Sequence, residues 1–215
     1  MAPSEAFILS GRSGLRGRLN IKEENAMRVV KKPEERRAEM VAAASKLFAQ
    51  QGFVKTSVAE IVSAVDVAKG LFYYYFTTKD DMVKAVVEGY CCYLGAEAEK
   101  IADMPGSAGE KIKWMTHHEA WNKCFTEPLL KDLCLPQHAA LYSDMCDRVV
   151  AHMGPAVERI AAQALLERGG DPADAHTLAG VGMYGVLMMA RRGEMSLDGA
   201  AEMFARMTGM DRNIA

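Results

Sequence analysis

The sequence predicts an all-α fold, and three observations lead to this prediction. In several segments from residue 40 onward, apolar residues recur at spacings of three and four, as on the buried face of an amphipathic helix. Helix start and stop signals separate these segments, including a proline in a first turn, a capping box and glycines at helix ends. Half of the 215 residues are apolar, which is enough for the chain to bury a core.

The first 31 residues are predicted to form a flexible basic arm. Gly, Ser, Pro and Arg dominate the first twenty positions, and no hydrophobic period is sustained there. Before Val29 we expect disorder or partial order, as is common at chain termini. In the alternative interpretation, Arg12, Arg16 and Arg18 lie along a phosphate backbone or in a minor groove of DNA.

Two helices are predicted to follow this arm. Pro33 suits a first helical position, and apolar residues at positions 40–48 recur at helical spacing until Gly52 ends the helix. Ser57 and Glu60 then form the S-x-x-E pattern of a capping box. This pattern predicts the start of a second, short helix.

A tight turn at residues 64–67 is predicted to lead into a third helix from Ala68 to about Tyr75. Asp66 is expected to adopt the left-handed conformation in this turn, which Asp tolerates better than most residues do. Spacings of three and four place two apolar residues toward the first two helices, namely Leu71 or Phe72 and then Phe76. The outer face of the third helix would carry Lys69, Gly70, Tyr73 and Tyr74.

The residues of that outer face are suited to contact with DNA. Gly70 costs about 1 kcal/mol of helix stability relative to alanine, and close approach of the backbone to a duplex would explain its presence. Lys69 supplies a charge that can reach phosphate or guanine, and tyrosine hydroxyls donate to phosphate oxygens. Three adjacent tyrosines, at residues 73–75, cannot all point inward from one helix.

This segment resembles the DNA-binding domain of the tetracycline-repressor (TetR) family of bacterial transcription regulators over about 50 residues, from Glu34 to Val83. The motifs that carry the resemblance are Gly52-Phe53, Thr56-Ser57, Glu60-Ile61, Val67-Ala68-Lys69-Gly70, Phe72-Tyr73-Tyr74-Tyr75-Phe76 and Lys79-Asp80. The resemblance implies an all-helical homodimer whose two recognition helices enter successive major grooves of a palindromic double-stranded operator. It also implies a C-terminal helical domain that binds a small-molecule effector and dimerises.

The resemblance also implies a set of DNA-contacting positions. Base approach is implied for Lys69, Gly70 and Leu71, and contact with base or phosphate for Tyr73. The implied phosphate contacts are Thr56, Tyr74, Tyr75 and Lys79, with Ser57 in the same interface.

The sequence departs from the pattern of the family at four positions. Asp66 stands where Gly is usual, and Tyr75 stands where His is common. Ala68 replaces a capping Ser, which costs about 1 kcal/mol. Leu71 replaces a small or polar residue; it can touch a thymine methyl group but cannot form a hydrogen bond with a base.

The charge distribution divides the chain near residue 80, close to the end of the segment that resembles the TetR family. Residues 1–80 contain 13 Lys or Arg and 9 Asp or Glu, whereas residues 81–215 contain 13 and 19. A basic part joined to an acidic part suggests two functions in one chain. We therefore predict a helix-turn-helix DNA-binding domain at residues 32–80 and an effector-binding and dimerisation domain at residues 81–215.

An aromatic face is predicted on a helix at residues 109–125, and its members are Trp114, His118, Trp121 and Phe125. Aromatic residues with one or two polar groups are typical of a pocket wall. Ordinary packed core with a satisfied histidine is the alternative. Further pocket candidates on a long helix predicted at residues 137–168 are Tyr142, Met145 and Cys146.

The last two predicted helices, at residues 173–192 and from Ser196 onward, carry the candidate dimer interface. Its members are Gly180, Met183, Tyr184, Met203, Phe204 and Met207. In the family the last two helices pair with their mates as a four-helix bundle, and this surface suits such an isologous contact. A hairpin buried within one chain is the alternative.

Two other functions have weaker support in the sequence. A metal- or redox-responsive regulator would use His117, His118, Cys124, Cys134 or Cys146. However, adjacent histidines on a helix point about 100° apart, and no i, i+4 ligand pair stands out. An all-helical enzyme is disfavoured because no GxSxG, HExxH, Walker or GxGxxG motif occurs in a suitable context. We therefore expect no catalytic residues, no cofactor and no metal.

A cytoplasmic protein is expected from two further observations. The five cysteines form no CxxC pair, which fits reduced thiols. The sequence shows neither a signal peptide nor the roughly 18 uninterrupted apolar residues that a membrane helix needs.

Overall fold

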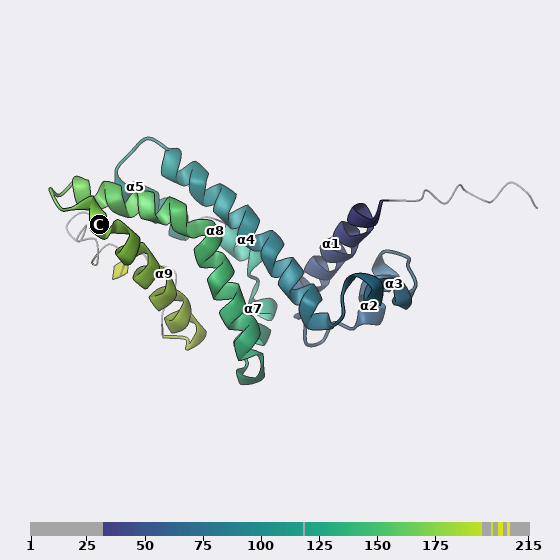
Figure 1. Cartoon of the computed structure of the whole chain (residues 1–215). Coiled ribbons are helices and arrows are strands. Elements are labelled where there is room, and N and C mark those ends of the chain that lie inside the picture. The colour runs from purple at the N-terminus through teal and green to yellow at the C-terminus, as the bar shows by residue number, and fades with distance from the viewer. Residues whose placement is uncertain (1–31, 118, 195–198, 200–201, 204–205, 207–215) are drawn as a thin grey trace, which may run out of the picture. The chain divides into compact units, whose positions relative to one another are not determined.

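The computed structural model describes residues 32–117, 119–194, 199, 202, 203 and 206. The predicted arm at residues 1–31 lies outside the described residues. The described helices belong to one compact unit that begins at Pro33, and none of the described residues lies in a β-strand (Figure 1). The predicted all-α fold is therefore confirmed.

The first helix forms as its sequence predicts. Helix α1 (Pro33–Gln51) begins at the proline and buries Met40, Ala44 and Phe48, which lie four residues apart on one face. Gly52 follows with a φ of 80°, a left-handed conformation that ends the helix at little cost for glycine.

A capping box starts the second helix, α2 (Val58–Ala64). The Glu60 N–H donates to the Ser57 hydroxyl at 3.2 Å, and the Ser57 N–H donates to the Glu60 carboxylate at 2.7 Å. Asp66 then adopts the predicted left-handed conformation, with a φ of 50°. The turn between the two helices of the helix-turn-helix is therefore confirmed.

Helix α3 (Lys69–Tyr75) follows the turn, and Ala68 precedes it without a side-chain cap. Phe72 and Phe76 are buried in the core, so the helix is anchored along one side. Helix α2 packs against both α1 and α3. This arrangement leaves the opposite side of α3 facing outward.

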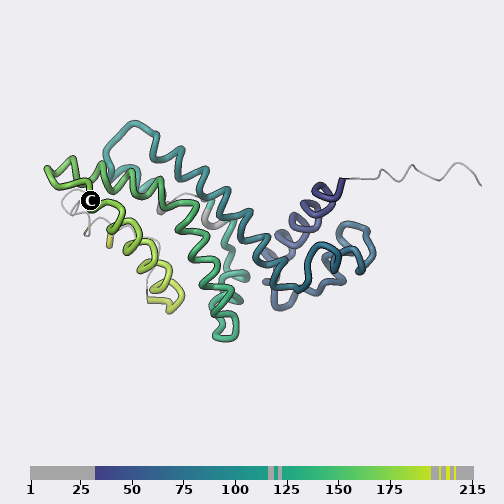
Figure 2. The backbone as a smooth tube through the Cα atoms, in the orientation of Figure 1, coloured from purple at the N-terminus to yellow at the C-terminus, as the bar shows by residue number. Residues whose placement is uncertain are grey.

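Helix α4 (Lys79–Asp103) joins this N-terminal group to the following helices without a break (Figure 2). A second capping box starts it, because the Asp81 N–H donates to the Thr78 hydroxyl and the Thr78 N–H donates to the Asp81 carboxylate. The predicted domain border at residues 80 and 81 falls in the first turn of α4. Both predicted domains therefore share this helix, and their border stays a prediction.

The prediction of a single helix at residues 109–125 is wrong. Helices α5 (Ala108–His117) and α6 (Ala120–Cys124) replace it, with a turn at Glu119 between them, and α7 (Glu127–Leu133) follows. Thr116 and the two histidines after it are weak helix formers, which favours a break at this point.

Helix α8 (Ala139–Leu166) packs against both α4 and α9 (Figure 1). It is shorter than the predicted range because a 3-10 turn, η1 (Pro136–His138), precedes it. A second turn, η2 (Pro172–Asp174), leads into α9 (Ala175–Arg191). Of the predicted last helix, residues 199, 202, 203 and 206 are helical, and the remainder lies outside the described residues. Among the described helices, none has both the length and the apolar composition that a membrane span needs.

Gly95 determines how closely α4 approaches α8. A Cβ atom at this position would lie 2.7 Å from the carbonyl oxygen of His152, and backbone atoms cannot yield as a flexible side chain can. We expect Gly95→Ala to lower the free energy of unfolding by about 1–3 kcal/mol, as overpacking does, despite the higher helix propensity of alanine. Chemical denaturation measures this change.

Gly89→Ala is the matched control in the same helix. A Cβ atom there would meet no described atom within 4 Å, so alanine is expected to raise the free energy of unfolding by up to about 1 kcal/mol. Equal effects of the two substitutions would contradict the close packing at Gly95.

Candidate nucleic-acid interface

The three adjacent tyrosines of α3 point in different directions, as predicted. Tyr73 and Tyr74 are 51% and 75% exposed, whereas Tyr75 is half-buried and packs against the core. The Tyr74 and Tyr75 rings meet edge to face with centroids 4.9 Å apart. Two phenol groups are therefore held at the surface by a helix whose inner side is fixed by Phe72.

Lys69 and Gly70 are exposed beside these tyrosines and complete the outer face of α3, which we define as Lys69, Gly70, Tyr73 and Tyr74. The Lys69 Nζ lies 6.0 Å from the centroid of the Tyr73 ring. A Cβ atom on Gly70 would meet no described atom within 4 Å, so packing within the described chain does not require glycine here. Leu71 is half-buried against the core, and only part of its side chain is accessible.

Ser57 lies at the exposed start of α2 and serves as its cap. The Ser57 backbone N–H, the Ser57 hydroxyl and the Gln51 side chain hold the pKa of the Glu60 carboxyl below its usual range. Because a contact with DNA is not tested by this geometry, the place of Ser57 in the interface stays a prediction.

Thr56 is not placed for a phosphate contact through its side chain. It is only 1% exposed, and its hydroxyl donates to the Gly52 carbonyl at 2.7 Å and accepts from the Gln51 amide at 3.2 Å. These bonds tie the end of α1 to the loop before α2. The side chain of Thr56 therefore positions this loop, and the phosphate contact predicted at this position stays a prediction.

The side chain of Lys79 is likewise occupied within the protein. Its Nζ donates to the carbonyl oxygens of Phe53, Val54 and Thr56 at 2.9, 3.3 and 3.2 Å. The phosphate contact predicted at Lys79 relies on the free backbone N–H groups at the start of α4, so the position of the ammonium group does not test it and it stays a prediction. Through these hydrogen bonds, the side chain of Lys79 connects the first turn of α4 to the loop between α1 and α2.

We expect Lys79→Met to lower the free energy of unfolding by about 1–3 kcal/mol, because three carbonyl groups of that loop would lose a charged donor. Thermal or chemical denaturation measures the change. Lys84→Met, at an exposed position of the same helix, is the control and should stay within about 0.5 kcal/mol of wild type. An unchanged free energy of unfolding in the Lys79→Met variant would contradict the role of Lys79 in connecting α4 to this loop.

The predicted aromatic pocket wall does not form one face. Phe125 is buried at 5% exposure whereas Trp114 is 57% exposed, because the chain turns between α5 and α6. His118 and the side chain of Trp121 lie outside the described parts of the chain. A surface pocket lies elsewhere, lined by residues of α1, α7 and the loop after α1: Gln50, Gln51, Lys55, Glu127, Pro128, Lys131 and Asp132.

The other pocket candidates, Tyr142, Met145 and Cys146, are brought together on the buried side of α8. The Tyr142 hydroxyl donates to the Leu187 carbonyl of α9, and the Arg191 guanidinium lies 5.0 Å from the centroid of the Tyr142 ring. Burial raises the pKa of the Cys146 thiol to about 12. These residues connect α8 to α9 in the core.

The candidate dimer residues on α9 differ in exposure. Gly180 and Met183 are half-buried, and Tyr184 is 40% exposed with its hydroxyl donating to Asp147. Met203 approaches Gly185 of the same chain, with its Cε 3.8 Å from a Cβ placed there, while Phe204 and Met207 lie outside the described residues. The same helix exposes two further apolar residues, Val181 at 61% and Met188 at 38%.

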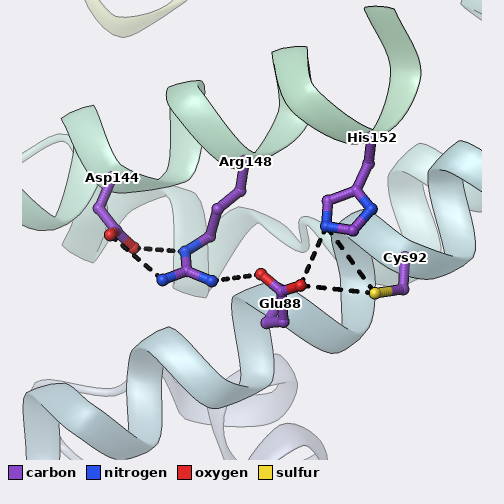
Figure 3. A network of polar contacts seen from close by, with 5 residues as sticks. All are labelled: Glu88, Cys92, Asp144, Arg148 and His152. Atoms are coloured by element: carbon purple, nitrogen blue, oxygen red, sulfur yellow. Dashed lines mark hydrogen bonds and ion pairs between the residues drawn. The ribbon is translucent and has the colours of Figure 1, made fainter. Parts of the chain in front are cut away.

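The histidine and cysteine residues considered for metal or redox chemistry form no group of three possible metal ligands among the described residues. Cys124 and Cys146 are buried and Cys134 is half-buried, and burial raises the pKa of the Cys124 thiol to about 11. His118 and the side chain of His117 lie outside the described parts. Within those parts, the structure instead groups Glu88, Cys92 and His152, which sequence reasoning did not single out (Figure 3).

An outward-facing helix that follows a short helix and a tight turn, and that carries a lysine and two phenols, defines a helix-turn-helix protein. Residues 40–86 match the sequence model of the bacterial regulatory proteins of the tetR family. This part of the chain belongs to that family, and the resemblance noted in the sequence is confirmed. The family model describes regulatory proteins, so the matched residues indicate a regulator rather than an enzyme.

Two curated relatives are similar to parts of the chain. The HTH-type transcriptional regulator HbdR of Aromatoleum sp. (strain CIB) is 28% identical over 123 residues, which cover 54% of this chain and 49% of that protein. The HTH-type transcriptional repressor KstR2 of Mycobacterium tuberculosis is 28% identical over 86 residues, covering 40% and 43%. The chain thus spans about half or less of the length of these relatives.

Solved structures share the fold over most of the chain. RolR in complex with the ligand resorcinol has a TM-score of 0.61 and 21% identity, covering 83% of this chain and 88% of RolR. A transcriptional regulator of the TetR/AcrR family from Thermobifida fusca has a TM-score of 0.55 and 22% identity, covering 84% and 99%. At these identities the likeness shows the fold.

Proposed function

We propose that this protein is a transcriptional regulator that binds a palindromic operator as a homodimer and represses neighbouring genes until a small-molecule effector releases it. The outer face of α3 is the observation that carries the proposal. It presents Lys69, Tyr73 and Tyr74 around a glycine that no internal contact in the described chain requires. The names of HbdR and KstR2, a regulator and a repressor, support the same function. Such a protein would work in the cytoplasm, where the bacterial chromosome lies.

A phosphate and base contact through this face has a clear physical basis. An ammonium group and two phenol hydroxyls can each donate to phosphate oxygens, and a glycine backbone can approach the duplex without steric hindrance. The remaining exposed edge of Leu71 can touch a thymine methyl group, which would give a preference at one base pair.

A dimer is required to read two half-sites. Val181, Tyr184 and Met188 lie at spacings of three and four on the exposed side of α9, so they form an apolar stripe that a second copy could cover. Two α3 helices related by a two-fold axis would then bind half-sites about one helical turn, or a multiple of it, apart.

The core between α8 and α9 is the proposed place of effector binding, within the proposed effector domain at residues 81–215. Tyr142, Met145 and Cys146 lie there, and RolR, which has the same fold, was crystallised with resorcinol. Because α8 packs against α4 as well as α9, a ligand inserted beside Tyr142 would shift α4. Helix α4 begins shortly after α3 ends, so its movement would change the position of the DNA-binding residues within residues 32–80.

We expect Gly70→Ala to separate DNA binding from stability. The free energy of unfolding should rise by up to about 1 kcal/mol, because alanine favours the helix and its methyl group meets no described atom. Operator affinity should fall at least tenfold, or about 1.4 kcal/mol, because the methyl group would prevent close approach to the duplex. Fluorescence anisotropy and denaturation on the same preparation give both values. An unchanged operator affinity would mean that Gly70 does not lie in the DNA interface.

The proposal is tested by electrophoretic retardation of promoter fragments from the neighbourhood of the gene at low salt. We expect one or more fragments to be retarded specifically, with an affinity that falls steeply as salt rises. Failure to retard any such fragment in preference to a coding-sequence fragment would count against a local repressor.

A further inference from the structure

Three side chains able to bind a metal meet where α4 packs against α8 (Figure 3). Glu88 and Cys92 lie one turn apart on α4, and His152 faces them from α8. The Cys92 Sγ lies 3.6 Å from Glu88 Oε1 and 3.9 Å from His152 Nε2. His152 Nε2 lies 3.0 Å from Glu88 Oε1.

The packing of the two helices fixes this arrangement. Gly95, three residues after Cys92, brings the α4 backbone against the backbone of His152, where any larger residue would meet its carbonyl group. The backbone of His152 is therefore held close to α4, about one turn from Cys92. Rigid helices position ligands more accurately than loops do.

A second pair of residues orients the carboxylate. Arg148 donates to Glu88 Oε2 and is itself held by Asp144, with its Nε 2.7 Å from Asp144 Oδ2. Glu88 Oε1 is thereby turned toward the thiol and the imidazole.

The spacing of the three ligand atoms resembles that of a tetrahedral zinc site. With Zn–S bonds of about 2.3 Å and Zn–N or Zn–O bonds of about 2.0–2.1 Å, sulfur lies about 3.6 Å from nitrogen and about 3.5 Å from oxygen, and nitrogen lies about 3.3 Å from oxygen. Each of the three distances in the structure is within about 0.3 Å of these values. Small side-chain movements would bring all three atoms onto one ion.

We propose that Glu88, Cys92 and His152 bind a Zn²⁺ ion, with a water molecule at the fourth position. A thiolate and an imidazole favour Zn²⁺ over Mg²⁺ or Ca²⁺, which need several oxygen ligands. The exposure of Cys92 gives the ion a path to the site. On binding, the Cys92 thiol releases its proton to solvent and the Zn–S bond forms. The Zn²⁺ would join α4 to α8, so its binding should raise the Tm of the protein.

The test is a cobalt titration of the tag-free, reduced protein followed by absorption spectroscopy. We expect a thiolate-to-cobalt charge-transfer band, visible d–d bands of tetrahedral intensity, and loss of both when Zn²⁺ is added. C92S should remove the charge-transfer band. H152Q should lower the affinity at least about 100-fold, since even residues that only orient a ligand change affinity about 10- to 100-fold.

Two variants serve as matched controls. His176 pairs with Glu158 at 2.9 Å, much as His152 pairs with Glu88, but no thiol of the described residues joins that pair, so H176Q should bind cobalt as wild type does. C134S removes a thiol that belongs to no such group in the described structure and should also leave binding unchanged. Circular dichroism of each variant confirms that helicity is retained.

Two results would overturn the site. One is an octahedral cobalt spectrum for the wild-type protein. The other is that C92S and H152Q both give the same cobalt spectrum as the wild-type protein. Because no DNA is present in the titration, its result is independent of the proposed repressor function.

Discussion

Replacing Lys69 and Tyr73 together by alanine is expected to lower operator affinity at least about 100-fold while the protein stays folded and dimeric. Each residue is exposed on the outer face of α3, and single contacts to phosphate or base contribute about 1–3 kcal/mol. A dimer loses each contact twice. The slope of log affinity against log salt should become shallower by about one for every phosphate contact removed.

The control for this double variant uses the same residue types on α4. Lys84 and Tyr93 are exposed there, and their joint replacement by alanine should leave operator affinity unchanged. Fluorescence anisotropy at several salt concentrations measures both variants, and size-exclusion chromatography checks the dimer. If the two double variants lost affinity equally, the outer face of α3 would have no special part in DNA binding.

Phe72→Ala is expected to have the largest effect on stability, lowering the free energy of unfolding by about 3–5 kcal/mol. Phe72 is fully buried, and its ring lies 5.5 Å from that of Phe76 and 5.3 Å from that of Tyr73. Its removal would leave a cavity beneath α3 and free the helix that carries the candidate interface. Chemical denaturation measures the loss.

Tyr74→Ala is the matched control, two residues away on the same helix. Tyr74 is 75% exposed, so its replacement should change the free energy of unfolding by no more than about 0.5 kcal/mol. A similar loss for Tyr74→Ala and Phe72→Ala would mean that α3 is not anchored through Phe72.

The helix-turn-helix could be predicted in detail because its determinants are local. The capping box of Ser57 and Glu60 needs only residues three apart, and the left-handed turn at Asp66 reflects a conformational preference of one residue. The division of α3 into a buried and an exposed face follows from helical spacing alone. These features require no knowledge of distant parts of the chain.

Two residues of the predicted interface have side chains with internal contacts that sequence spacing does not show. Lys79 stands at a helix start that would suit an anion, yet its ammonium group reaches back 23 to 26 residues to the loop carbonyls. Thr56 is polar but buried, because its hydroxyl finds partners at the end of α1. The resemblance implies a phosphate contact at both positions, which stays a prediction, and the structure adds an internal contact for each side chain.

The cluster of Glu88, Cys92 and His152 was missed for a related reason. The i, i+4 pair on α4 is a visible signal, but Glu88 and His152 are 64 residues apart in the sequence. Only the packing of α4 against α8 brings them together. The break between α5 and α6 had a weak signal in Thr116 and the histidines that follow, and it removed the aromatic face predicted across residues 109–125.

The most direct test of the central claim, that α3 is the DNA-reading surface of a dimer, is selection of bound fragments from sheared genomic DNA of the source organism. The wild-type protein is predicted to enrich fragments that share an inverted repeat, with half-sites centred about 10 base pairs or a multiple apart, and the Lys69→Ala/Tyr73→Ala variant to enrich none of them. Absence of any shared sequence with wild type, or equal enrichment by the double variant, would contradict the claim.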